Sequence, residues 1–385
     1  MKYFLGKVSL LALVGVMAAN VPGIAAEDTI KIGFNAPLTG FAAADGLSAK
    51  IGAQLAVDQA NAEGGINGVQ IELVVYDDQA SPKNSVPIAN KLISQDKVNI
   101  GISGSYSGAT RAAAGVYQDA GIPFISAFAV HPDITRAGDF VFRTSFVGEV
   151  QGRAGAKLVG EILGKKKVVL IVLKNDFGKS LANGFREAAA QFGITVIGEY
   201  EYSIKDRQFG PIVSKVKADA PDAIYATGYF FTAGPLVNQL RAAGVTVPVI
   251  GQEGYDSQKF IDIAGPAAEG VIITTSLDRD SQSAETKNFI SAFEKVAGYK
   301  ADMVAASGHT AAMVAIAAMR KAGADDPVAI RDAIAAIALQ TATGKISFNA
   351  LGEVRKDVQV QVVKDGLWRH FSVISDDKLL APPDL

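Results

Sequence analysis

A loop of small residues, Ser103–Ala109, combines three serine hydroxyls with glycines at a position where chemistry is possible. The loop follows a short apolar run, Asn99–Ile102, and precedes a helix predicted over Thr110–Asp119. Such a loop lies at the end of a strand and at the N-terminus of a helix, where free N–H groups and the helix dipole attract anions. Serine is also a favoured helix cap, so this stretch alone predicts either an ordinary cap or an anion site.

Polar and aromatic side chains also stand where other predicted strands end. These strand-end positions are Ser103–Ser107, Ala127–Val130, Asn175–Phe177, Tyr229 and Glu253–Tyr255. Ligands of open parallel sheets bind beyond the carboxyl ends of the strands, so we expect one cleft between the two halves of the chain. Backbone donors after Ser105 suit a carboxylate, and the Glu253 carboxylate suits an ammonium group. The pair predicts a zwitterionic ligand, while the alternative for Glu253 is an ordinary surface residue.

Strands and helices are expected to alternate along most of the chain. In the first half, apolar strands are predicted at Ile30–Pro37, Gln70–Tyr76, Asn99–Ile102, Ile122–Ser126 and Phe140–Thr144. In the second half, they are predicted at Lys167–Leu173, Thr195–Tyr202, Ala223–Thr227, Val249–Gly251 and Gly270–Thr274. Helical segments between the strands indicate βαβ units with right-handed crossovers. The predicted fold class is therefore α/β, with two doubly wound parallel sheets.

The last third of the chain contains too few elements to form a domain of its own. Helices are predicted at Glu285–Ala297, Ala301–Ala322 and Pro327–Ile337, with strand-like stretches at Gly344–Phe348 and Val358–Val373. We therefore expect these elements to complete the two lobes that the earlier strands begin.

The first 26 residues are expected to be a cleaved secretory signal peptide. Lys2 and Lys7 give a positive start, Val8–Ala19 is apolar, and small residues lead up to Ala26. A membrane anchor is the alternative, but the apolar run is shorter than the ~20 residues a span needs. The 385-residue chain has no cysteine, so neither a disulfide framework nor lipidation is expected. No later run is predicted to be a membrane helix, which leaves a freely diffusing exported protein.

Signatures of catalysis and of nucleic-acid binding are absent from the sequence. His131, His309 and His370 are far apart, and no cysteine is available to a zinc site. The segment Gly104–Gly108 resembles a nucleophile elbow, but its central residue is Tyr106 rather than serine. The formal charge is −2 and no basic block occurs. We therefore expect no enzyme, no metal, no cofactor and no nucleic-acid partner.

Several segments together resemble one known family. They are AEGGINGVQIELVVYDDQASPKNSVPIANKLI from Ala62, YQDAGIPFIS from Tyr117, NDFGKSLA from Asn175, QLRAAG from Gln239 and GQEG from Gly251. Over the whole mature chain, the sequence resembles the periplasmic leucine/isoleucine/valine-binding proteins of ABC transporters, which have the type I periplasmic binding fold. Each segment alone is weak evidence, but the combination is specific.

The resemblance implies two lobes joined by a three-segment hinge that closes on the ligand. The crossings are expected near Gly148, near Ser276 and near Arg355. Lobe one would comprise residues 27–147 plus 277–354, and lobe two residues 148–275 plus 355–385.

The resemblance also implies which residues meet the ligand. Ser107 matches the hydroxyl that holds the ligand carboxylate in the family, while Val130 replaces a family threonine and so loses one carboxylate contact. Phe128 can still offer its carbonyl group to the ligand amine. The full set of candidate ligand-binding residues is Asp45, Tyr106, Ser107, Phe128, Ala129, Val130, Phe177, Tyr229, Glu253 and Val304.

The function that the resemblance implies is that of a substrate-binding protein of an ABC importer. We expect a monomer in the periplasm that binds a small amino acid, with a branched aliphatic one as the first candidate, and passes it to a membrane permease. The missing threonine leaves alternatives open. They are an aromatic acid, an amide or a non-branched amino acid as the ligand, or a sensory role on the same fold.

Overall fold

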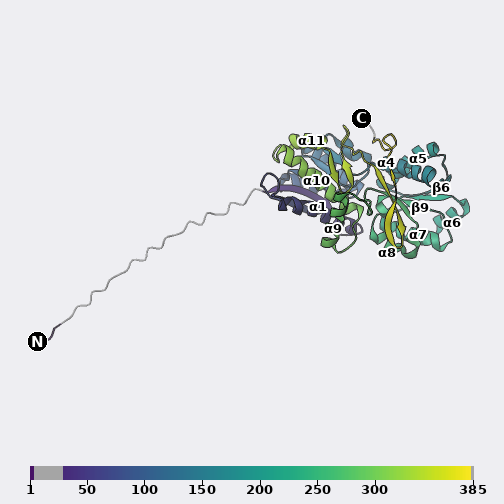
Figure 1. The fold of residues 1–385 in the computed structure, drawn as a ribbon, viewed down its shortest axis with the longest axis horizontal. Helices are drawn as coiled ribbons and strands as arrows, with labels where there is room; N and C mark the ends of the chain where they lie inside the picture. Colours follow the sequence, from purple (N-terminus) through teal and green to yellow (C-terminus); the bar gives the residue numbers. More distant parts are fainter. Residues whose placement is uncertain (4–28, 383–385) are drawn as a thin grey trace.

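The computed structural model describes residues 1–3 and 29–382. The predicted signal peptide therefore lies outside the described residues, apart from its first three positions. Two α/β halves lie side by side, with α1, α9, α10 and α11 in one and α5, α6, α7 and α8 in the other (Figure 1). This arrangement confirms the predicted α/β class with two wound sheets.

The first sheet has five parallel strands in the order β2-β1-β3-β4-β5. Its strands are β1 (Ile30–Ala36), β2 (Ile71–Asp77), β3 (Ile100–Ser103), β4 (Phe124–Ser126) and β5 (Val141–Arg143). The connecting helices are α1 (Ala43–Ala62), α2 (Pro82–Ser94) and α3 (Ser107–Ala120), with a 3₁₀ turn at Pro132–Ala137. Strand residues on both faces are buried because helices cover the sheet on both sides.

The second sheet has seven strands in the order β14-β13-β10-β9-β8-β6-β7. Five are parallel: β6 (Lys167–Leu173), β7 (Thr195–Tyr202), β8 (Ala223–Ala226), β9 (Val249–Gly251) and β10 (Ile272–Thr275). A hairpin of β13 (Val358–Lys364) and β14 (Leu367–Ile374) adds antiparallel to β10. Its helices are α4 (Gly148–Lys157), α5 (Asp176–Ala189), α6 (Gly210–Asp219), α7 (Phe230–Ala242) and α8 (Gln258–Ala264). The parallel strands repeat the winding order of the first sheet.

The remaining elements pack beside the first sheet, largely through α1. They are α9 (Ala284–Ala297), α10 (Met303–Ala322), α11 (Pro327–Ala335) and a small hairpin of β11 (Leu339–Thr341) and β12 (Gly344–Ile346). Strand β11 is an element that the sequence analysis missed. We call the part built on the five-stranded sheet the first lobe and the part built on the seven-stranded sheet the second lobe.

The chain passes between the two lobes in three places. It leaves the first sheet after Arg143 and enters α4 at Gly148, and it leaves the second sheet after Thr275 to reach α9. It then re-enters the second sheet at Val358. Three chain segments thus connect the two lobes. Such an arrangement forms a hinge, because small backbone rotations in these segments let one lobe move relative to the other.

Helices α1 and α10 pack against each other at very short distance. A side chain at Gly52 would place its Cβ 2.0 Å from the carbonyl oxygen of Ala305, so only glycine fits there. Helix α10 is long and apolar enough to cross a membrane by composition alone, which the sequence analysis did not predict. However, 83% of its apolar window is buried in the protein interior. It is a core helix that packs against α1, α11 and the first sheet.

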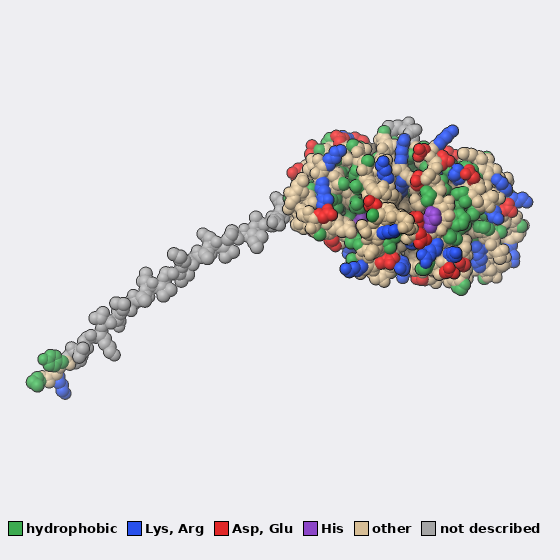
Figure 2. Space-filling model, in the orientation of Figure 1, with side chains coloured by type: hydrophobic (Ala, Val, Ile, Leu, Met, Phe, Trp, Pro, Cys, Tyr) green, Lys and Arg blue, Asp and Glu red, His purple; other side chains and the backbone are tan. Residues whose placement is uncertain are grey.

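The surface carries charges of both signs. Figure 2 shows acidic and basic side chains interspersed over the face in view, which matches the small formal charge of −2.

Candidate functional site

The carboxyl ends of the parallel strands of both sheets point toward the boundary between the lobes. In each sheet the second strand in sequence lies on one side of the first, and the later strands lie on the other side. The strand order therefore reverses between β1 and β3 in the first sheet and between β6 and β8 in the second. Ligand crevices of doubly wound sheets lie at such reversal points. The loops after β3, β6, β8 and β9 meet at one cavity of about 390 Å³, a volume that includes space opening to solvent.

Nine of the ten candidate residues line this cavity, drawn from both lobes. They are Asp45, Tyr106, Ser107, Phe128, Ala129, Phe177, Tyr229, Glu253 and Val304. Val130 does not line it, but it is fully buried directly behind it and donates its N–H to the Ser107 hydroxyl at 3.3 Å. Gly254, which belongs to the predicted strand-end positions, also lines the cavity, and so do Asp256 and Met303, which the sequence analysis did not select.

The loop after β3 leaves backbone donors free at the cavity. Helix α3 starts at Ser107 with Tyr106 at the N-cap position, and no side chain caps it. Within the described residues, the N–H groups of Ser107 and Gly108 have no hydrogen-bond partner. Of the two explanations that the sequence left open, the ordinary serine cap is therefore not what the structure has. The N-terminus of α3, where the helix dipole is positive, therefore lies at the cavity with unpaired donors.

The other two serines of this loop do not cap α3 but form hydrogen bonds that stabilise the loop. The Ser105 hydroxyl donates to Asp78 at 3.0 Å, and the Ser103 hydroxyl pairs with Thr110 at 2.8 Å. Asp78 is fully buried and also accepts from the Asn35 amide at 2.7 Å. This network holds the loop in one conformation without a ligand, so binding would cost little conformational entropy in the loop.

A buried arginine fixes the neighbouring loop after β4. Arg143 donates to the carbonyl oxygens of Ala129 and His131, each at 2.8 Å, and forms a salt bridge with Glu353 at 2.7 Å. Both charged side chains are essentially inaccessible to solvent. Because the Ala129 carbonyl is already used, Phe128 remains the residue of this loop whose carbonyl could meet a ligand.

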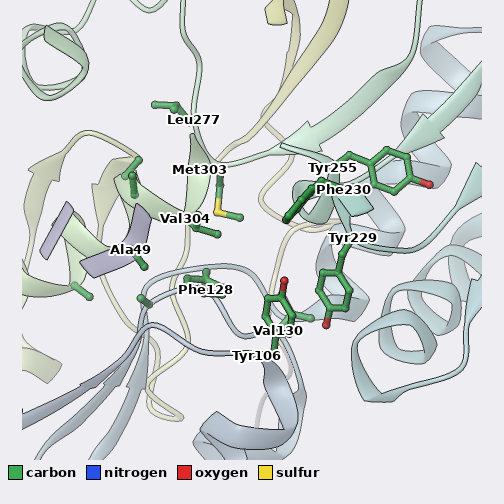
Figure 3. Packing of buried hydrophobic residues seen from close by; sticks show 14 of the residues in the cluster. Ala49, Tyr106, Phe128, Val130, Tyr229, Phe230, Tyr255, Leu277, Met303 and Val304 are labelled. Carbon is green, nitrogen blue, oxygen red and sulfur yellow. The ribbon is translucent and has the colours of Figure 1, made fainter. Parts of the chain in front are cut away.

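A stack of aromatic rings joins the two lobes across the cavity. The ring centroids of Tyr106 in the first lobe and Tyr229 in the second are 4.2 Å apart, and the ring planes differ by only 6°. Tyr229 also stacks on Phe177, with a centroid distance of 4.7 Å. Figure 3 shows Tyr106 and Tyr229 side by side, with Phe128, Met303 and Val304 around the adjoining space. These rings form an apolar wall and bring the lobes into contact.

Glu253 presents a buried carboxyl group on the second-lobe side of the cavity. It is 3% exposed and accepts a hydrogen bond from the Ser145 hydroxyl at 3.1 Å. Burial raises the pKa of Glu253 to about 8, although the nearby Lys356 ammonium opposes part of this rise. Burial likewise lowers the pKa of Lys356 to about 7, and its Nζ has no hydrogen-bond partner in the described part of the chain. Among the described residues, Glu253 forms no salt bridge, although Lys356 lies near enough to influence its charge.

Asp45 presents a second buried carboxyl group, from the first-lobe side. It accepts a hydrogen bond from the Tyr106 hydroxyl at 2.6 Å, and burial raises its pKa to about 7. Asp256, by contrast, is neutralised by Arg279 and also accepts from the N–H of Met303 at 3.2 Å, a contact between the lobes. Asp256 could have been found from sequence, because it follows Glu253 by three residues at the same strand end.

Across residues 1–3 and 29–382, no cluster of three or more histidine or acidic side chains could hold a metal ion. The cavity is lined by Ser107 at the start of α3, by carboxyl groups from both lobes and by aromatic rings.

The fold and the interlobe cavity define a two-lobed protein that binds a small ligand. A match to the periplasmic binding protein family covers residues 29–366. The leucine-, isoleucine-, valine-, threonine- and alanine-binding protein of Pseudomonas aeruginosa is 31% identical over 331 residues, which is 86% of this chain and 88% of that protein. This chain therefore belongs to the periplasmic binding protein family.

Solved structures agree with this assignment. The Streptococcus pneumoniae branched-chain amino acid transporter substrate-binding protein LivJ, in complex with isoleucine, is 30% identical with a TM-score of 0.84, covering 90% of this chain and 99% of that one. A solute-binding protein of an ABC transporter from R. palustris, in complex with benzoate, is 25% identical with a TM-score of 0.82, covering 90% and 96%. Similar structures thus hold both amino and non-amino ligands.

Proposed function

We propose that this protein captures an α-amino acid between its lobes and delivers it to the permease of an ABC importer. The observation that carries the proposal is a pairing across one cavity. Within the described residues, the N–H groups of Ser107 and Gly108 have no hydrogen-bond partner on one lobe, and the carboxyl group of Glu253 forms no salt bridge on the other. An α-carboxylate and an α-ammonium group would satisfy both ends with charge-assisted hydrogen bonds.

The apolar wall favours a small aliphatic side chain as the third part of the ligand. Phe128, Val304, Met303 and the tyrosine rings would contact it. The P. aeruginosa relative binds leucine, isoleucine, valine, threonine and alanine by its name, and the LivJ structure holds isoleucine. A branched-chain or other small aliphatic amino acid is the ligand class we propose.

Binding would be coupled to closure at the three crossings. We propose residues 27–147 plus 277–354 as lobe one and residues 148–275 plus 355–385 as lobe two, which agrees with the sheet to which each strand belongs. The ligand contacts both lobes only when the cleft is shut, so its binding energy shifts the molecule toward the closed state. Desolvation in the shut cleft strengthens the polar contacts.

The setting of this function is also a proposal. We propose an exported, non-lipidated monomer in the periplasm, with a signal peptide cleaved near Ala26, and no catalytic activity. The permease is the partner, and a sensory role would use the same cavity and the same hinge.

A second candidate ligand is an aromatic acid. Val130 supplies no hydroxyl for the carboxylate, the wall is rich in rings, and the R. palustris structure holds benzoate. Such a ligand would leave Glu253 without an ammonium partner, so the amino acid is favoured.

Isothermal titration calorimetry decides between the two ligand classes. The mature protein is titrated with leucine, isoleucine, valine, threonine and alanine, and separately with benzoate. We expect saturable binding of at least one amino acid and none of benzoate. Binding of benzoate with no response to any amino acid would overturn the ligand class while leaving the fold and the hinge intact.

A further inference from the structure

One carboxyl group in the cavity can accept a further hydrogen bond that the α-amino and α-carboxylate groups of a ligand would not supply. Asp45, on α1, is 7% exposed and lines the cavity. Its Oδ2 accepts from the Tyr106 hydroxyl at 2.6 Å. Its Oδ1 accepts no hydrogen bond, and neither oxygen lies in a salt bridge, within the part of the chain that the structure describes.

The two neighbouring acids are satisfied, which singles out Asp45. Asp302 accepts from the Ser48 hydroxyl at 2.6 Å and from the N–H of Ala305 at 2.8 Å. Asp256 is paired with Arg279 and accepts from the Thr275 hydroxyl. Both acids also add negative potential at Asp45. Asp45 Oδ1 is not fully enclosed, so a molecule that fills the cavity can reach it. A ligand that covers this acceptor without supplying a donor would leave it unsatisfied, so a donor is expected on the ligand.

We propose that Asp45 receives a hydrogen-bond donor carried by the side chain of the ligand, and so narrows the proposed class toward small amino acids whose side chain carries one polar group. The proposal rests on the proposed function, in which the α-ammonium group is already held by Glu253 on the opposite lobe. A second donor must then sit on the side chain. The apolar wall beside Asp45, formed by Met303 and Val304, suits the carbon atoms of a short side chain.

Three chemistries provide such a donor: a hydroxyl, a primary amide and an ammonium group. All three present N–H or O–H to a carboxylate, and they differ in charge and reach. The hydroxyl of threonine is the shortest of them and fits a ligand class that otherwise consists of small aliphatic amino acids.

Matched pairs of ligands test this inference by calorimetry on the mature protein. L-threonine and L-valine differ by a hydroxyl in place of a methyl, and L-asparagine and L-leucine by an amide in place of an isopropyl group. L-2,4-diaminobutyrate supplies the ammonium arm, with L-norvaline as its apolar partner. We expect at least one polar member to bind about tenfold or more tighter than its apolar partner.

Two variants assign the preference to Asp45. In Asp45→Ala the polar member should lose its advantage over its partner. In Tyr106→Phe only the hydroxyl bound to Oδ2 is removed, so the preference for the polar member should persist. Thermal unfolding of each variant checks that both remain folded.

The possible results distinguish a failure of the role of Asp45 from a failure of the proposed amino-acid function. If valine, leucine and norvaline bind the parent protein as tightly as their polar partners, the role of Asp45 is wrong and the amino-acid function stands. An unchanged polar-to-apolar ratio in folded Asp45→Ala also overturns it. If no amino acid binds at all, both proposals fall.

Discussion

At the scale of single residues, the cavity holds polar groups that, among residues 1–3 and 29–382, keep hydrogen-bonding capacity for a ligand. Glu253 on one lobe and the first N–H groups of α3 on the other are such groups. When one partner of a buried charged contact is removed, the other charge stays buried without compensation for its lost hydration. Glu253→Ala should therefore weaken the binding of an amino acid by roughly 2–4 kcal/mol. Calorimetry checks this, and unchanged affinity would mean that Glu253 does not hold the amine.

Ser107→Ala should have a smaller effect, because the backbone donors of the loop remain. We expect a loss of about 1–2 kcal/mol in binding free energy. The same titration measures it, with Ser94→Ala as a control, since Ser94 lies at the exposed end of α2. A loss larger than that of Glu253→Ala would show that the hydroxyl, not the backbone, carries the carboxylate.

The raised pKa of Glu253 makes the affinity for an amino acid depend on pH. With a pKa of about 8 in the ligand-free protein, Glu253 must release a proton before it can pair with an ammonium group. Affinity should therefore rise with pH between about pH 6 and pH 8, by at most about tenfold per unit, and Glu253→Gln should weaken this rise. For benzoate the sign is opposite, because a neutral Glu253 repels a carboxylate less. Titrations at three pH values give the slope.

At the scale of elements, the site depends on close packing between α1 and α10. Gly52→Ala places a Cβ against the backbone of Ala305, so α1 and α10 must move apart. We expect a loss of about 1–3 kcal/mol in the free energy of unfolding. Gly115→Ala is the matched control, since no atom lies within 4 Å of a Cβ there and α3 gains from alanine. Thermal unfolding that ranks the two variants in reverse order would contradict the packing described here.

Strand ends could be predicted from sequence, whereas contacts formed by the return of the chain could not. Tyr229 and Glu253 follow apolar strands, and the topology of a parallel sheet fixes where such residues lie. Met303 meets Asp256 only because α10 belongs to the first lobe although it follows the second in sequence. Lys356 approaches Glu253 from the third crossing, and no local pattern signals that contact. Neither of these long-range contacts could be predicted from the sequence.

At the scale of the whole molecule, the lobes are held together by the ring stack and by smaller contacts at the rim. Arg111 and Asp176 form an exposed ion pair between the lobes at 3.1 Å, which adds little in water. Tyr106 packs flat on Tyr229 inside the cleft. Tyr106→Ala should therefore open the ligand-free protein, seen as a larger radius of gyration in small-angle X-ray scattering, whereas Arg111→Ala should change it little. Equal curves for Tyr106→Ala and the parent would show that the stack does not hold the lobes together.

The central claim concerns the orientation of one small molecule between two lobes. A crystal structure of the mature protein with the amino acid that binds tightest in calorimetry tests it most directly. We predict the ligand carboxylate within about 3 Å of the N–H groups of Ser107 and Gly108, and its ammonium group within about 3 Å of the Glu253 carboxylate. A ligand lying in the reverse orientation, or one that leaves Glu253 without a cation, would contradict the account.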